Sequence, residues 1–164
     1  MLFLQTILYT RDMKIYMASD HAGFFLKEKM KENLISRGFL VEDFGAKNFD
    51  DADDYPDFVH PAVVKFIKET NGDNSRGICL VYGASGTGEA IMANRTRGAR
   101  AVVCNSDNLE IIKLGRQHNN ANVLSIGAKF VTELVALEAV KVFMTTGFEG
   151  GRHVKRVLKI DMLQ

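Results

Sequence analysis

Short apolar runs alternate with longer amphipathic runs along nearly the whole chain. The short runs are apolar on both faces and bounded by Gly, Asp, Asn or Ser, a pattern typical of buried parallel strands. They cover residues 14–18, 40–44, 78–82, 101–104 and 123–126. Helical periodicity covers residues 23–36, 57–69, 108–117 and 132–145, a short stretch after Gly88, and a last one from His153 towards Met162. This alternation predicts an α/β fold, a doubly wound (Rossmann-like) three-layer sandwich with a five-stranded parallel sheet.

The length of the chain suits one domain. It has 164 residues, of which 46% are apolar, enough for an ordinary hydrophobic core. We expect residues 13–164 to form that domain. Residues 1–12 either lie upstream of a natural start at Met13 or are a genuine extension that packs as an extra strand or short helix. Their apolar part is too short to span a membrane and lacks a cleavage site, so we expect no signal peptide there.

Charge and cysteine content narrow the range of partners. The formal net charge is +1 and no basic run stands out, so we expect neither nucleic acid nor a membrane surface as a partner. Cys79 and Cys104 lie in apolar runs, which predicts buried thiols and fits a reducing cytoplasm. The four histidines lack metal-ligand spacing, so we expect no metal.

Polar segments follow or adjoin the predicted strands. In parallel sheets ligands bind beyond the carboxyl ends of the strands, which makes these segments candidate sites. They read SDHAG at residues 19–23, GASGTGE at 83–89, NSDN at 105–108, and RQHNNAN at 116–122 just ahead of the fifth strand. The acidic stretch 45–57 predicts a long surface loop, and loops of that length are often functional.

Some of these polar residues also have simpler interpretations. Asp20 fits a helix cap near Ala22, and Asn119 fits the C-terminus of a helix. Both interpretations stay open beside the functional ones. We assign His60 to an ordinary surface or core position.

The segment GASGTGEA at residues 83–90 has the glycine spacing of a nucleotide P-loop. Glu89 and Ala90, however, replace the lysine and hydroxyl residue that such a loop needs, which disfavours an NTPase. A loop of small residues between a strand and a helix still suits an anion. The anion that best tolerates a neighbouring carboxylate is one that the carboxylate creates. We therefore predict that Glu89 removes a proton next to a carbonyl, while the loop N–H groups and the Ser85 hydroxyl stabilise the enediolate.

The chain resembles the ribose-5-phosphate isomerase B family, which includes the galactose-6-phosphate isomerase subunits. The resemblance covers residues 14–160 and rests on SDHAG, DDYPDF, GASGTGEAIMANR, GARAVVC, RQHNNANVLSIG and GGRHVKR in this order. It implies interconversion of aldose and ketose sugar phosphates without a cofactor or metal. It also implies a homodimer or tetramer whose active sites lie between subunits. Some members have a cysteine base at the position of Gly83; this chain resembles the branch with glycine there and a glutamate base, here Glu89.

The resemblance also implies roles for individual residues. Glu89 is the base, Ser85 stabilises the intermediate, and His118 helps to open the sugar ring. Residues in substrate binding are Asp20, His21, Tyr55, Ala84, Gly86, Thr87, Gly88, Asn119, Lys129, Arg152 and Arg156. Lys129, Arg152 and Arg156 would hold the phosphate. Lys129 departs from the family's arginine, and an ammonium lacks the two-pronged geometry of a guanidinium.

We expect a ribose 5-phosphate isomerase that uses an enediolate. Two alternatives remain: an isomerase of a six-carbon sugar phosphate such as allose or galactose 6-phosphate, and a non-catalytic sugar-phosphate-binding subunit. The presence of Glu89, Ser85 and His118 together favours catalysis, because a binding protein needs the basic residues but no base. A nucleotide-binding module is a more distant third.

Overall fold

The computed structural model describes residues 13–163, so the expectation for residues 1–12 falls outside the described part of the chain. Five strands form one sheet in which every neighbouring pair is parallel. They are β1 (Lys14–Ser19), β2 (Leu40–Asp43), β3 (Gly77–Gly83), β4 (Ala101–Cys104) and β5 (Val123–Gly127). Their order is β2-β1-β3-β5-β4. The predicted five-stranded parallel sheet is confirmed.

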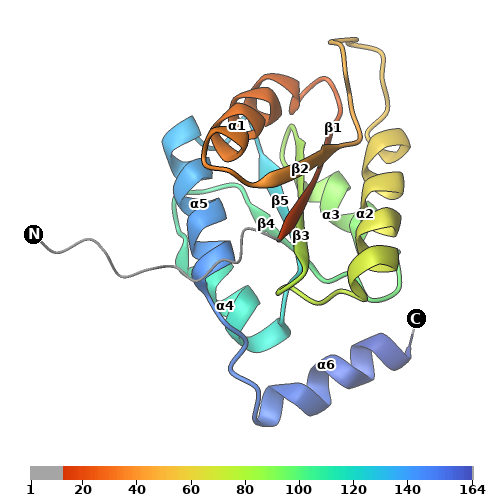
Figure 1. Cartoon of the computed structure of the whole chain (residues 1–164), viewed down its shortest axis with the longest axis vertical. Coiled ribbons are helices and arrows are strands. Elements are labelled where there is room, and N and C mark those ends of the chain that lie inside the picture. Colours follow the sequence, from red (N-terminus) through yellow and green to blue (C-terminus); the bar gives the residue numbers. More distant parts are fainter. Residues whose placement is uncertain (1–12, 164) are drawn as a thin grey trace, which may run out of the picture.

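Helices cover both faces of this sheet (Figure 1). On one face lie α1 (Phe24–Ser36), α4 (Glu110–Asn119) and α5 (Glu133–Thr145), which share a hydrophobic core with the sheet. On the other face lie α2 (Pro56–Thr70) and α3 (Thr87–Ala93), with a second core. These layers confirm the doubly wound three-layer sandwich. No helix within residues 13–163 is long and apolar enough to cross a membrane.

The expectation that all five strands are buried is wrong for the two at the edges. Leu40 in β2 is 57% exposed, and most of β4 is only partly buried. The interior strands β3 and β5 are buried along their whole length. Each edge strand has a neighbour on one side only, and the apolar character of a run does not show how many neighbours it has.

The parallel direction of the strands gives the molecule two distinct ends. Loops that follow β1, β2, β3 and β5 gather at the carboxyl ends of the strands. Each returning helix ends at the opposite, amino end. The last helix, α6 (Arg152–Met162), also lies at the amino end, below the sheet in Figure 1. Since β3 has seven residues, the two ends are separated by roughly 20 Å, at about 3.3 Å per residue.

Two residues of the RQHNNAN segment form hydrogen bonds that hold together the loops at the amino ends of the strands. Arg116 donates to main-chain carbonyls at and beyond the C-terminus of α5. The Asn122 side chain, fully buried, donates to the carbonyl oxygens of Gly98 at 2.8 Å and Gly72 at 3.3 Å. Its Oδ1 accepts from the Arg100 N–H at 2.8 Å. Asn122 therefore joins three loops that contain no regular hydrogen-bond ladder.

We expect Asn122→Ala to lower the free energy of unfolding by about 3 kcal/mol, because it leaves buried main-chain groups without partners. Asn119→Ala, in the same segment but exposed, should change it by less than about 0.5 kcal/mol. Urea unfolding followed by circular dichroism measures both. Equal losses in the two variants would contradict the supporting role of Asn122.

Candidate active site

The loop after β3 is fixed from two sides. Gly86 adopts φ 76°, and a Cβ there would lie 3.1 Å from the main chain at the end of β5. The Ser125 hydroxyl donates to the Gly86 carbonyl oxygen at 2.5 Å. The Lys129 N–H donates to the Ala84 carbonyl oxygen at 3.0 Å. The predicted small-residue loop is thus held in one shape by the neighbouring strand, and its last two residues, Thr87 and Gly88, form the first turn of α3.

Glu89 folds back from the first turn of α3 over the end of β3. The residue is only 4% exposed, and its carboxylate occupies the space beside Gly83: a Cβ at Gly83 would lie 1.8 Å from Oε1. Burial raises the pKa of Glu89, and the nearby charge of Asp20 raises it further. A carboxyl group with a raised pKa has the basicity that a general base near neutral pH requires.

Asp20 and His21 follow β1 at the carboxyl end of the sheet, the end where the Glu89 loop lies. Asp20 is 7% exposed, and its Oδ1 accepts from the N–H groups of Ala22 at 2.9 Å and Gly23 at 3.2 Å. The capping interaction considered from the sequence therefore exists. It engages one carboxylate oxygen at the start of α1.

His21 is held by Asp53, a residue that the sequence interpretation did not single out. Oδ1 of Asp53 lies 2.7 Å from Nδ1 of His21 and also accepts its main-chain N–H at 2.8 Å. The hydrogen bond to Asp53 raises the pKa of His21, and Asp20 adds to the effect. Asp53 belongs to the quoted DDYPDF motif, but its partner 32 positions away is visible only in the fold.

Tyr55 and Ser85 also lie at the carboxyl end of the sheet, beside the Glu89 loop. A Cβ at Gly88 would come within 2.9 Å of Cζ of Tyr55, so the tyrosine ring lies directly against the loop. The Ser85 hydroxyl oxygen accepts from the Thr87 N–H at 3.2 Å. That contact leaves the Ser85 O–H able to donate to a bound group.

Four of the predicted site residues lie at the other end of the sheet. They are His118 and Asn119 at the C-terminus of α4, and Arg152 and Arg156 on α6. Both arginines are exposed. The described chain therefore brings the Glu89 loop together with Asp20, His21, Tyr55 and Lys129, but not with His118 or the two arginines.

His118 has neighbours that the sequence interpretation missed. Its ring stacks on that of His153, with centroids 4.3 Å apart and planes 4° from parallel. Nε2 of His118 and of His153 lie 3.8 and 3.9 Å from Oε2 of Glu149. His153 lies in the GGRHVKR motif, but its approach to His118 depends on how α6 crosses α4.

Within residues 13–163, two groups of side chains have the composition of cation ligands. They are His118, Glu149 and His153 at the amino end, and Asp20, His21 and Asp53 at the carboxyl end, with ligand atoms within 4.8 Å of one another in each group. Sequence spacing does not indicate either group, because each joins residues from separate elements. The expectation of a metal-free protein remains a prediction.

The cysteines are where the apolar runs indicate. Cys79 and Cys104 are both unpaired and buried. Burial raises the pKa of each thiol. Neither is suited to act as a base or nucleophile.

The fold and the loop define an α/β protein that carries a buried carboxylate at the carboxyl end of its parallel sheet. A family model described as Ribose/Galactose Isomerase matches residues 15–160. The probable ribose-5-phosphate isomerase B of Mycoplasma genitalium is 41% identical over 146 residues, covering 89% of this chain and 92% of that protein. The ribose-5-phosphate isomerase B of Mycobacterium tuberculosis H37Rv is 38% identical over 146 residues, covering 88% and 86%.

Solved structures agree with these relatives. The crystal structure of ribose-5-phosphate isomerase B from Mycoplasma genitalium with bound ribulose-5-phosphate matches with a TM-score of 0.84 and 37% identity, covering 92% of this chain and 95% of that one. The Thermotoga maritima ribose 5-phosphate isomerase matches with a TM-score of 0.82 and 38% identity, covering 92% and 98%. The chain belongs to the Ribose/Galactose Isomerase family.

We expect Gly83→Ala to displace the Glu89 carboxylate, because the new Cβ would occupy its place. Outside its buried position, Glu89 should titrate with a pKa closer to its ordinary value. NMR of ¹³C-labelled carboxyl groups measures this pKa. Gly147→Ala is the matched control, since nothing lies within 4 Å of a Cβ built there. An unchanged Glu89 titration in folded Gly83→Ala would contradict the close contact.

Proposed function

We propose that this chain is an aldose–ketose isomerase that interconverts ribose 5-phosphate and ribulose 5-phosphate through an enediolate. The observation that carries the proposal is the buried Glu89 carboxylate, which has a raised pKa and lies beside an ordered loop of small residues. The relative from Mycoplasma genitalium, whose crystal structure holds ribulose-5-phosphate, supports the choice of substrate.

In the proposed mechanism Glu89 moves a proton between C1 and C2 on one face of the open-chain sugar. The Ser85 hydroxyl and the main-chain N–H groups of residues 84–88 stabilise the negative oxygen of the intermediate. Asp20, His21 and Tyr55 bind the sugar around this loop. Asp20 and His21 follow β1, and the loop 84–88 lies between β3 and α3 and is bonded to residues at the end of β5. These groups therefore orient the reacting carbons before the proton moves.

The remaining groups act on the other parts of the sugar phosphate. We assign ring opening to His118, with Asn119 binding beside it, and phosphate binding to Lys129, Arg152 and Arg156. Fixing the phosphate far from the reacting carbons uses remote binding energy to orient them. Lys129 stands beside the Glu89 loop, whereas the arginines stand on α6.

We infer that a working site is built from two subunits of a homodimer or a tetramer. The roughly 20 Å between the two ends of one sheet supports this, because Glu89 and His118 of one chain cannot reach the same pentose. Exposed aromatic rings beside His21 also support a covered surface there: Phe25 is 65% exposed, Phe49 is 52% exposed, and their rings stack at 5.5 Å.

The length of the sugar and the cellular location of the protein are further parts of the proposal. A six-carbon sugar phosphate and a non-catalytic binding role stay as alternatives, and the retained Glu89 disfavours the second. We infer a cytoplasmic location, which the two unpaired buried cysteines support.

We first test wild-type protein in a coupled assay with ribose 5-phosphate, allose 6-phosphate and galactose 6-phosphate, expecting the fastest turnover with ribose 5-phosphate. Glu89→Gln should then lower this turnover by at least about 10²-fold while substrate binding persists. It should also abolish exchange of the C2 proton with deuterated solvent. Cys79→Ser and Cys104→Ser are the controls and should retain exchange. Normal exchange in Glu89→Gln would exclude Glu89 as the base.

The shared site predicts rescue between two inactive variants, Glu89→Gln and Arg152→Ala/Arg156→Ala. In a hybrid dimer one site combines the intact Glu89 of one chain with the intact arginines of the other, while the second site has both defects. Random exchange should restore roughly a quarter of wild-type activity. Each variant mixed with itself serves as control. If subunit exchange is complete and no activity returns, the site lies within one chain.

A further inference from the structure

Lys27 is a charged residue on the face of α1 that also buries Met30 and Leu34. Its side chain has 0% exposure, although its neighbours along α1, Leu26 and Glu28, are only partly buried. The ammonium donates to both carboxylate oxygens of Asp43, at 2.9 and 3.0 Å, and to Oε1 of Glu28 at 2.7 Å. It also donates to the main-chain carbonyl oxygen of Ala46 at 3.0 Å. A buried lysine with this many partners is held in one position.

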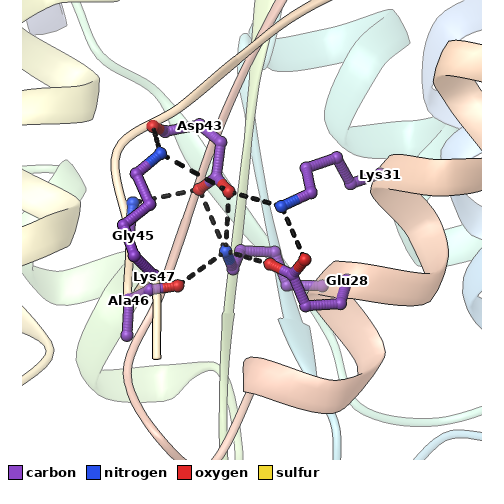
Figure 2. Close-up of polar contacts among 7 residues, drawn as sticks. Glu28, Lys31, Asp43, Gly45, Ala46 and Lys47 are labelled. Atoms are coloured by element: carbon purple, nitrogen blue, oxygen red, sulfur yellow. Dashed lines mark hydrogen bonds and ion pairs between the residues drawn. The ribbon is translucent and has the colours of Figure 1, made fainter. Parts of the chain in front are cut away.

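Two of the partners of Lys27, Asp43 and Ala46, lie in the turn 43–47, defined here as the last residue of β2 and the four residues that follow it; the third partner, Glu28, lies on α1. Figure 2 shows Asp43 at the centre of this cluster, with Lys31 reaching towards it from α1; the Glu28 carboxylate binds the Lys31 ammonium and the Lys27 ammonium. The Asp43 carboxylate also accepts the Gly45 N–H at 3.0 Å. Burial alone would raise the pKa of Asp43, but hydrogen bonds from Lys31, Gly45 and Lys27 outweigh it and lower the pKa.

Residues of the turn 43–47 also form hydrogen bonds with the end of β1. The Ser19 N–H donates to the Gly45 carbonyl oxygen at 2.7 Å, and the Ala46 N–H donates to the Ser19 carbonyl oxygen at 2.6 Å. Asp20 and His21 come directly after Ser19. The main chain of Ala46 thus connects two groups: its carbonyl oxygen accepts from the Lys27 ammonium, and its N–H donates to the end of β1, which Asp20 follows.

The turn also begins the loop that carries Asp53 and Tyr55. The end of that loop next to α2 lies at the carboxyl end of the sheet, where Asp53 binds His21 and the ring of Tyr55 lies against Gly88. A nonpolar side chain at position 27 would fill the same volume but could not hold the Ala46 carbonyl or the Asp43 carboxylate. A buried ion pair gives little net stability, so its value here is in fixing one arrangement.

We propose that Lys27 is a positioning residue, which acts through the turn 43–47 to hold His21 and Asp53 in the geometry that binds the sugar phosphate. The kinetic part of this inference rests on the proposed function; the positioning itself does not. No contact between Lys27 and substrate is involved.

The test compares Lys27→Met with Lys31→Met. Lys31 is the matched control because its ammonium also binds Asp43, at 2.8 Å, and Glu28, at 2.6 Å, whereas Lys27 also donates to the Ala46 carbonyl at 3.0 Å. We expect the pKa of His21, measured by NMR titration of its ring protons, to fall towards its ordinary value in Lys27→Met. It should stay raised in Lys31→Met. A change in fold stability alone would not move this pKa in one variant only.

Kinetics give the second measurement. In Lys27→Met kcat/KM for ribose 5-phosphate should fall at least about tenfold, and in Lys31→Met by less than about threefold. A lowered His21 pKa with unchanged kinetics would support the positioning and count against the proposed role of His21 in binding. A folded Lys27→Met with the wild-type His21 titration would overturn the inference.

Asp43→Asn covers the case in which Lys27→Met does not fold. It removes the charge that holds Lys27 but keeps the volume and one acceptor oxygen. The His21 pKa should fall here too, by a smaller amount. A wild-type His21 titration in folded Asp43→Asn would equally overturn the inference.

Discussion

The common direction of all five strands is the constraint on which the rest of this molecule depends. It gathers the turns after β1, β2, β3 and β5 at the carboxyl ends of the strands, and every returning helix ends at their amino ends. Asp20, Glu89 and the loop carrying Asp53 consequently meet although they are far apart in the sequence. For the same reason His118, near the end of α4, lies at the far end of the sheet. A parallel sheet of this size therefore places the candidate site residues of one chain at two separate ends, which is why we propose a site shared between two copies of the chain.

The sequence predicts the strands, the helices and the glycine-rich loop well, because each depends on local pattern. Periodicity in residues 78–82 and 123–126 identifies the central strands to within a residue at most boundaries. The resemblance then assigns site residues through motifs that are also local. What it does not predict are the contacts between motifs. Asp53 beside His21, and His153 stacked on His118, each join two segments whose meeting depends on the crossing of whole elements.

Burial is the other quantity that pattern predicts poorly. Leu40 is apolar and exposed because β2 has a neighbour on one side only, whereas Lys27 is charged and fully buried because the turn after β2 folds over it. The hydrophobicity of the two side chains predicts the wrong burial for both residues. For Leu40 the decisive fact is the number of neighbouring strands. For Lys27 it is the set of nearby acceptors, the Ala46 carbonyl oxygen and the Asp43 carboxylate, which need a buried donor.

The acid at position 89 has a steric explanation as well as a chemical one. A P-loop lysine would point at bound phosphates, but Glu89 folds back into space that exists because residue 83 has no side chain. Any side chain at position 83 begins with a Cβ at the place of the Glu89 carboxylate. In the family that this chain resembles, a cysteine base at that position and a glutamate base six residues later would therefore compete for one volume. Two such side chains cannot occupy it together. The absence of a side chain at position 83 is therefore what allows the carboxylate of Glu89, the base in the proposed mechanism, to come from α3.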